Sequence, residues 1–262
     1  MIKQSPEYIT PLNEQNVNKD NANLLVCPFA GASNSAFNSW RSTDISGLNC
    51  QLVNYSGHGC RFKEPAFNDI GLLANELITI IKKFYPPRHN SLLLCGHSMG
   101  AQVAFETAIQ LEKNGWELSG LILSGCQAPH IQARRLLSDL NDDDFIQQLI
   151  AIGGCDAELI KQPQLLKQFM PLLRADFLAT ERYFFQKSTK RLFHTPVLLM
   201  YGSHDSEADK NEVEAWQDWI DKHCTINCIA GDHFYPITRP NTFCRFIIDF
   251  YHQFTCLLYT YP

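Results

Sequence analysis

The sequence predicts an α/β fold in which a mostly parallel central sheet carries helices on both faces. Two observations support this prediction. Short apolar segments alternate with segments whose apolar residues recur every three or four positions, as in strand–helix–strand units. The alternation stops once, at about residues 129–193, where helical patterns follow one another without a strand. We expect that stretch to be an all-helical lid insertion over the carboxyl edge of the sheet.

The first half of the chain supplies clear elements. Residues 1 to about 22 are polar and hold at most one short edge strand. Apolar runs predict strands at residues 23–27, 50–54 and 92–95, and helical spacing predicts helices near residues 37–45 and 69–84. Pro86 and Pro87 end the second of these helices.

The alternation continues in the second half. A helix is expected from about residue 101 to 111, followed by a strand at 120–124. After the insertion we expect a strand at 197–201, a helix at 212–222, a strand near 225–229 and a last helix at 241–254. Inside the insertion, Gly153, Gly154, Pro163 and Pro171 are expected to break the helical patterns. A chain of 262 residues with 45% hydrophobic residues is expected to fold as a single domain, residues 1–262.

Composition excludes several classes of function. The net charge is −5 and no basic tract occurs, so we expect no nucleic-acid partner. No apolar run reaches 18 residues and no signal-peptide pattern precedes residue 22, so we expect a cytoplasmic protein without a membrane span. The ten cysteines are scattered without a C-x-x-C pair and are expected to be mostly reduced, buried thiols. We expect a monomer that needs no metal and no organic cofactor.

The stretch at residues 91–112 carries the most information. The apolar run at 92–95 meets Gly96-His97-Ser98-Met99-Gly100, and a helical pattern follows at once. Strand, G-x-S-x-G and helix in this order form the nucleophile elbow of the α/β-hydrolase fold. The turn is tight, so the two glycines are expected where neighbouring chain leaves no room for a Cβ. Ser98 is the candidate nucleophile.

A serine hydroxyl needs a base, and the base needs an acid to orient it. In this fold the acid follows a late strand, and Asp205 is the first carboxylate after the strand at 197–201. Glu207 and Asp209 in the same loop are its rivals. The base follows the last strand, where His233 stands; His58, His97, His204 and His223 are less well placed. We expect the side chain of His97 to point away from Ser98.

An oxyanion hole needs two N–H donors. The backbone N–H of Met99, directly after the nucleophile, is one candidate. The other is expected in the turn after the first clear strand, Pro28-Phe29-Ala30-Gly31, where the N–H of Ala30 is the first choice and that of Phe29 the second. The alternative is a plain small-residue turn.

Four motifs together resemble those of type II thioesterases, the stand-alone editing enzymes of nonribosomal peptide and polyketide synthesis. They are Pro28-Phe29-Ala30-Gly31-Ala32-Ser33, Tyr55-Ser56-Gly57-His58-Gly59-Cys60-Arg61, the elbow, and Gly231-Asp232-His233-Phe234. The likeness runs from about Leu24 to Phe250. It departs from the family at Ser56, where proline is frequent, and at His58, where arginine is frequent.

The resemblance implies a substrate: an acyl group bound through a thioester to the phosphopantetheine arm of an acyl or peptidyl carrier protein. Aromatic residues are expected to bind the acyl group, among them Phe29 in the turn and Phe145 and Phe177 in the insertion. Arg134, Arg135, Lys187, Lys190 and Arg191 are candidates for docking an acidic carrier domain, although solvated surface charge explains them equally well. The particular pathway and the preferred acyl length are left open.

Two other functions compete with this one. A carboxylesterase or a medium-chain acyl thioesterase can use the same scaffold and the same Ser-His-Asp chemistry. A binding module without catalysis is the third possibility, and the complete set of candidate residues in the expected chain order argues against it.

Overall fold

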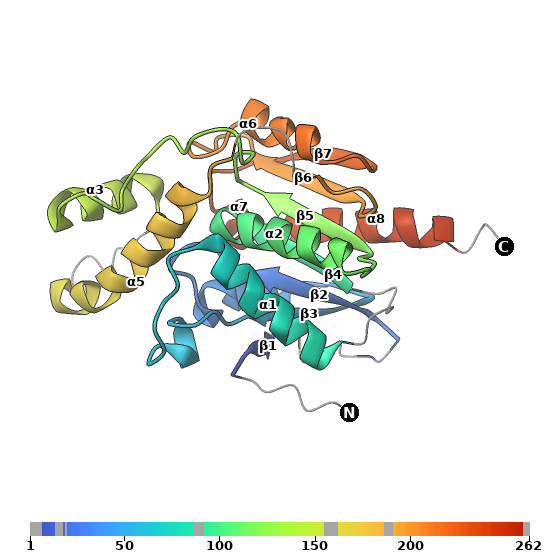
Figure 1. The fold of residues 1–262 in the computed structure, drawn as a ribbon, viewed down its shortest axis with the longest axis horizontal. Coiled ribbons are helices and arrows are strands. Elements are labelled where there is room, and N and C mark those ends of the chain that lie inside the picture. Colours follow the sequence, from blue (N-terminus) through green and yellow to red (C-terminus); the bar gives the residue numbers. More distant parts are fainter. Residues whose placement is uncertain are drawn as a thin grey trace.

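The computed structural model describes residues 7–13, 18, 20–85, 92–154, 162–185 and 191–258. Within these ranges seven strands form one sheet in the order β1-β3-β2-β4-β5-β6-β7 (Figure 1). The strands are β1 (Ile9–Pro11), β2 (Ala22–Cys27), β3 (Leu48–Val53), β4 (Leu92–His97), β5 (Gly120–Ser124), β6 (Val197–Gly202) and β7 (Cys224–Ile229). All neighbours are parallel except β1, which pairs antiparallel with β3. The predicted, mostly parallel sheet is confirmed.

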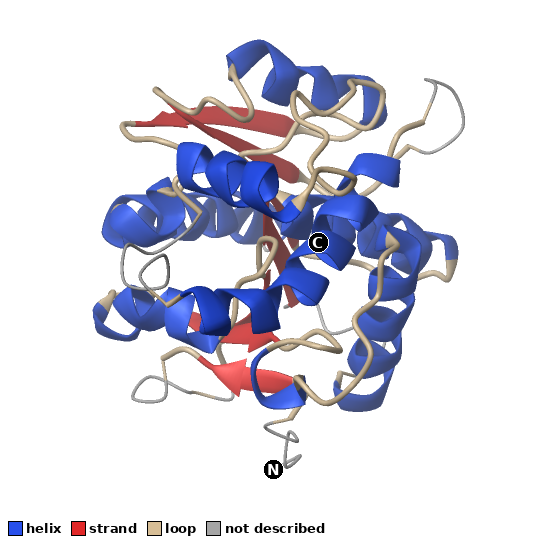
Figure 2. Ribbon diagram, turned by 90° about the vertical axis from the view of Figure 1, so that its left-hand side faces the viewer, coloured by secondary structure: helices blue, strands red, loops and turns tan. Residues whose placement is uncertain are grey.

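Helices cover both faces of this sheet (Figure 2). One face packs against α1 (Ile70–Phe84), α2 (Met99–Lys113) and the 3₁₀ helix η4 (Ala215–Trp219). The other packs against the 3₁₀ helix η2 (Asn34–Ser42), α7 (Tyr235–Thr238) and α8 (Pro240–Leu258). Two shorter helices, η3 (Gly59–Arg61) and α6 (Lys210–Glu214), lie in loops.

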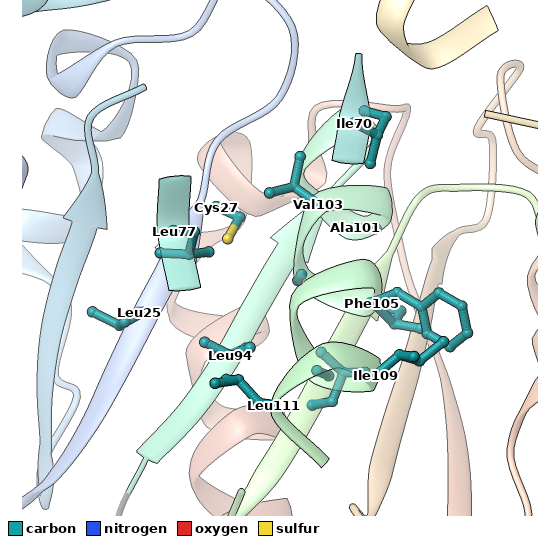
Figure 3. Packing of buried hydrophobic residues seen from close by; sticks show 14 of the residues in the cluster. Leu25, Cys27, Ile70, Leu77, Leu94, Ala101, Val103, Phe105, Ile109 and Leu111 are labelled. Atoms are coloured by element: carbon teal, nitrogen blue, oxygen red, sulfur yellow. The ribbon is translucent and has the colours of Figure 1, made fainter. Parts of the chain in front are cut away.

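The strands divide their side chains between two hydrophobic cores. In β2, Leu25 and Cys27 enter the core under α1 and α2, whereas Leu24 and Val26 enter the core under η2 and α8. This alternation is the two-residue period of a strand buried on both faces. Figure 3 shows Leu25, Cys27 and Leu94 of the sheet against Leu77 of α1 and Val103 of α2. The continuous apolar runs in the sequence are explained by this double burial.

A helical insertion lies between β5 and β6, beyond the carboxyl ends of the strands (Figure 1). Its described helices are α3 (Asp142–Ile152) and α5 (Pro163–Arg182). Asn141 caps α3 by accepting from the N–H of Asp144, and Gly153 ends it with a φ of 82°. The insertion has a small core of its own, made by Leu137, Phe145, Leu149 and Met170.

Three expectations about helices are corrected. Residues 34–42 form a 3₁₀ helix that is kinked at Phe37, and its period of three places Phe37 and Trp40 side by side in the core. The helix expected at 212–222 ends at Trp219, because Ile220 is extended and forms a bridge with Leu192. Pro171 does not break α5. The N–H that proline lacks would have bonded to the carbonyl of the exposed Lys167, where water can replace it.

The eight described cysteines are all free thiols, as expected from their spacing. Cys27, Cys50, Cys95, Cys126 and Cys244 are buried, and burial raises the pKa of Cys27 to about 12. Cys228, which lies in an apolar strand, is nevertheless exposed. No helix in the described ranges has the length and apolar character needed to cross a bilayer.

Candidate active site

Ser98 lies at the tight turn between β4 and α2. Its φ of 55° and ψ of −123° make it the one non-glycine residue with positive φ in the part of the chain that the structure describes. Its N–H donates to the carbonyl of Ser124 at 2.9 Å, and its carbonyl accepts from the N–H of Ala101 at 2.9 Å. Such a conformation costs about 1–3 kcal/mol and persists only where the surrounding chain imposes it. Ser98 therefore has the strained backbone that is typical of an elbow nucleophile.

The two glycines of the elbow stand where a side chain has no room. A Cβ at Gly96 would lie 2.0 Å from the carbonyl oxygen of Gly100. A Cβ at Gly100 would lie 2.1 Å from the carbonyl oxygen of Cys27, at the end of β2. The close approach of β2 to the start of α2 therefore requires glycine, as the sequence predicts.

His233 and Asp205 are in direct contact. His233 follows β7, Asp205 follows β6, and Nδ1 of the histidine lies 3.0 Å from each carboxylate oxygen. The aspartate also accepts the N–H groups of Glu207 at 2.8 Å and Ala208 at 3.1 Å. Because Nδ1 faces the carboxylate, Nε2 is the ring nitrogen left for a second group.

The environment keeps Asp205 ionised. Its side chain has no exposed surface, and burial alone would raise the pKa of this carboxyl. The hydrogen bond and positive charge of His233, together with the N–H of Glu207, outweigh burial and lower that pKa below its usual value. A buried carboxylate of this kind can hold an imidazole in one orientation and stabilise its protonated form.

The rival residues are engaged elsewhere. Glu207 forms an ion pair with Arg135 at 3.1 Å, and Asp209 is the N-cap of α6, with a capping box to Glu212. His204 is exposed and bonds to Ser203. Of the acidic and histidine candidates weighed from the sequence after β6 and β7, Asp205 and His233 are the pair that meets.

The side chain of His97 packs against His233 of the His233–Asp205 pair. Its ring centroid lies 4.8 Å from that of His233, and its Nδ1 lies 3.0 Å from the hydroxyl of Ser124. That hydroxyl lies 2.5 Å from the hydroxyl of Tyr235, which donates to the carbonyl of Met200 at 3.0 Å. Burial and the positive charge of His233 lower the pKa of His97 to about 3, so its ring is neutral. The sequence indicates that this side chain avoids Ser98, but not that it supports His233.

Ser98 and His233 line one cavity of about 100 Å³ between the sheet edge and the helical insertion. The body contributes Phe29, Ala30, Gly125 and Phe234, and α5 contributes Leu173 and Phe177. Phe234 packs edge-on against Phe29, with ring centroids 5.3 Å apart. Phe234 and Gly125 are missed by sequence reasoning, although Phe234 lies inside a motif, directly after His233. A Cβ at Gly125 would lie 2.3 Å from the ring of His97 and 3.3 Å from Asp205.

The turn after β2 lies on the same cavity. Phe29 and Ala30 both line it, and the N–H of Ala32 closes the turn by donating to the carbonyl of Phe29 at 3.0 Å. The N–H of Gly31, the residue after Ala30, donates to the carboxylate of Asp176 in α5 at 2.7 Å. Ala30 and Met99 therefore stay the predicted donors of an oxyanion hole.

The aromatic residues expected at the acyl group are placed differently. Phe29 and Phe177 line the cavity and stay predicted contacts of the acyl group. Phe145 does not: it has no exposed surface and packs edge-on against Phe177 inside the insertion, with Arg174 above its ring. The helical period indicates a buried face but not which neighbour covers it, so core and cavity residues look alike in the sequence.

The basic residues proposed for docking are paired within the chain. Arg134 contacts Asp209 and Glu212, Arg135 contacts Glu207, and Arg191 contacts Asp221. Lys187 and Lys190 lie outside the described residues. The charge of the three arginines is already balanced, so these contacts do not support a docking role. In the described ranges no group of three His, Cys, Asp or Glu side chains is arranged to hold a metal ion.

Strained serine, paired histidine and aspartate, and parallel sheet together define the class of α/β-hydrolase-fold enzymes. The family model for the thioesterase domain matches residues 22–251. The chain therefore belongs to the thioesterase family, and it is an enzyme of that kind.

Individual relatives are named as thioesterases too. The probable anguibactin biosynthesis thioesterase AngT of Vibrio anguillarum is 41% identical over 223 residues, which cover 84% of this chain and 88% of that protein. YbtT, a type II thioesterase from the yersiniabactin NRPS/PKS biosynthetic pathway, has a solved structure that matches with a TM-score of 0.87, 43% identity and coverage of 94% and 99%. The medium-chain S-acyl fatty acid synthase thioesterase of Rattus norvegicus is 31% identical, over 91% and 90% of the two chains. The resemblance to type II thioesterases predicted from the sequence is confirmed.

Proposed function

We propose that this protein is a stand-alone thioesterase that removes short or aberrant acyl groups from the phosphopantetheine arm of carrier proteins in nonribosomal peptide or polyketide synthesis. The observation that carries the proposal is the His233–Asp205 pair on the cavity that Ser98 also lines. The proposed type of pathway is supported by AngT, which is named for anguibactin biosynthesis, and by YbtT of the yersiniabactin NRPS/PKS pathway.

In the proposed mechanism Ser98 attacks the thioester carbonyl while Nε2 of His233 takes its proton. Asp205 holds the ring and stabilises the imidazolium. The oxyanion binds to the N–H groups of Ala30 and Met99. The pantetheine thiol, with a pKa near 8.5, leaves with a proton from His233. His233 then activates water, which hydrolyses the acyl-serine ester and frees Ser98.

The cavity favours a short acyl group. Its volume of about 100 Å³ is well below the range of about 300–1,000 Å³ typical of pockets for larger ligands. The apolar walls supplied by Phe29, Phe177 and Phe234 suit an alkyl chain. A longer substrate would require the insertion to move.

The partner that fits this chemistry is a carrier-protein domain whose flexible arm reaches the cavity. The proposed enzyme acts in the cytoplasm as a monomer, and its residues perform both half-reactions without a metal or organic cofactor.

A second candidate is a medium-chain acyl thioesterase. The observation in its favour is the 31% identity to the rat medium-chain enzyme over nine-tenths of both chains. The small cavity argues for the short-chain function in the conformation described here.

A comparison of three substrates tests the proposal: acetyl-phosphopantetheinyl carrier protein, the matching medium-chain carrier protein, and an oxygen-ester analogue of the first. We expect the highest kcat/KM with the acetyl thioester. We also expect loss of at least about 10³-fold in Ser98→Ala, with an unchanged circular dichroism spectrum. Preference for the medium-chain substrate would favour the second candidate, and preference for the oxygen ester would indicate an esterase.

A further inference from the structure

Asp176 joins three separated segments of the chain. It lies on α5 with no exposed surface, and one of its oxygens, Oδ2, accepts from the N–H of Gly31 at 2.7 Å and faces Nε2 of His58 at 2.8 Å. Gly31 belongs to the turn after β2, and His58 to the glycine-rich turn after β3. Asp176 therefore links α5 of the insertion to two turns of the body through one buried carboxylate oxygen.

His58 supplies the matching positive charge. Its Nδ1 lies 3.1 Å from the carbonyl oxygen of Ser56, and its Nε2 faces Asp176. Both acceptors lack a proton to donate, so the ring satisfies both contacts only as a doubly protonated imidazolium. Burial lowers the pKa of His58, but the hydrogen bond and charge of Asp176 and the carbonyl of Ser56 raise it more, and the net direction is upward.

The contact falls beside the predicted oxyanion hole. The N–H of Gly31 belongs to the peptide unit that joins Ala30 to Gly31, so Asp176 fixes the orientation of that unit. The neighbouring peptide unit, which carries the N–H of Ala30, is linked to it through one Cα. Leu173, one turn before Asp176, presses on the same turn: a Cβ at Gly31 would lie 2.4 Å from its Cδ2 atom.

We propose that Asp176 is a positioning residue that aims the Ala30 N–H at the oxyanion, with His58 as its counter-ion. The proposal rests on the function given above. It makes the oxyanion hole dependent on how α5 is seated: when the insertion lifts to admit a substrate, Asp176 leaves Gly31, and when it returns the donor is restored. Transition-state stabilisation then accompanies closure over the acyl group.

The test removes the pair without leaving a buried charge. The double variant His58→Phe/Asp176→Leu replaces both groups with apolar side chains. Folded proteins often tolerate such a replacement of a buried ion pair. We expect kcat for acetyl-phosphopantetheinyl carrier protein to fall by about 10–100-fold, since a misplaced donor costs rate rather than binding, with KM changed less than about threefold. Asp176→Asn keeps an acceptor for Gly31 and should retain more activity than the double variant.

Tyr183→Phe is the matched control. The hydroxyl of Tyr183, at the end of α5, donates to Glu106 of α2 at 3.0 Å, so this variant also removes a buried contact between insertion and body. It does not touch the turn at Ala30, and kcat should stay within about twofold of wild type. An equal loss of kcat in Tyr183→Phe and in the double variant would overturn the proposal, as would a folded double variant with unchanged kcat.

A second readout separates this inference from the proposed function. Fluorophosphonate labelling of Ser98 places a P–O group in the oxyanion hole and requires no thioester. We expect slower labelling of the double variant and normal labelling of Tyr183→Phe. If wild type labelled normally but hydrolysed no thioester, the proposed function would fail, whereas slow labelling of the double variant would still support the role of Asp176. Equal labelling rates would refute that role.

Discussion

His97 is next to Ser98 in the sequence but supports His233 in the structure. It precedes Ser98, yet its ring packs under His233 and bonds to Ser124. With its pKa lowered to about 3, it stays neutral throughout the neutral pH range. A second cation at this position would oppose protonation of His233, so a neutral ring beneath the proposed base favours proton transfer.

This neutral histidine makes the fold sensitive to acid. An unfolded histidine binds a proton below about pH 6.5, whereas folded His97 does not until about pH 3, so stability falls as pH drops below 6.5. Between pH 7 and pH 5 we expect wild type to lose about 2 kcal/mol more unfolding free energy than His97→Gln, measured by urea denaturation.

Two other titrating groups, Asp205 and His58, do not disturb this comparison. Asp205 has a lowered pKa, so its contribution is present above its unfolded value of 3.8 and is lost only at lower pH. His58 has a raised pKa, so its contribution is complete below about pH 6.5 and is lost as pH rises through its folded value. Both occur in wild type and variant alike. Identical pH dependence in the two proteins would show that His97 is not the group responsible.

The positions of Ser98, Asp205 and His233 could be predicted because each lies in the turn or loop that follows a strand. Parallel strands bring such positions to one edge of a sheet. The His58–Asp176 contact could not be predicted, because 118 residues separate the two and no local pattern links a helix residue to a particular loop. Phe145 was expected at the acyl group but packs inside the insertion, because the helical period indicates a buried face and does not show which neighbour covers it.

At the scale of elements, α5 has a cavity side and an outer side. Phe177 lines the cavity, whereas Phe169 on the same helix is 44% exposed. The side chain of Phe177 therefore limits the space for the acyl group, whereas that of Phe169 does not.

Phe177→Ala should therefore lengthen the accepted acyl chain. We expect the ratio of kcat/KM for octanoyl over acetyl thioester to rise by about tenfold, because one substrate methylene that an apolar pocket accepts or rejects is worth about 10–200-fold. Phe169→Ala is the matched control and should leave the ratio within about twofold. Equal shifts in both variants, or none in Phe177→Ala, would mean that the cavity does not set the chain length.

The strands were easier to predict than the helices. Apolar runs of four to six residues mark the buried strands, and the observed bounds agree closely. The helix expected at 212–222 was too long because Ile220 pairs with Leu192, a long-range contact that overrides helical spacing. Pro171 illustrates the opposite error, since an exposed helix face tolerates the lost hydrogen bond that usually ends a helix.

At the scale of the whole molecule, the sheet acts as a frame that gathers loops from distant parts of the chain. The carboxyl ends of β2, β4, β6 and β7 lead into Ala30, Ser98, Asp205 and His233. The insertion between β5 and β6 closes the space above them and contributes Leu173 and Phe177 to it. The proposed chemistry depends on both parts: the body supplies the reactive groups, and the insertion supplies walls and the carboxylate of Asp176.

The proposed function depends most on Ser98 as the residue that carries the acyl group. Rapid-quench mixing with acetyl-phosphopantetheinyl carrier protein, followed by peptide mass spectrometry, measures this directly. We predict a transient acetyl group on the peptide that contains Ser98 and no such group in Ser98→Ala. When the His233→Ala variant is acylated with an activated ester, its acetyl group should last longer than that of wild type. Steady turnover by Ser98→Ala, or an acetyl group on a different residue, would contradict the account.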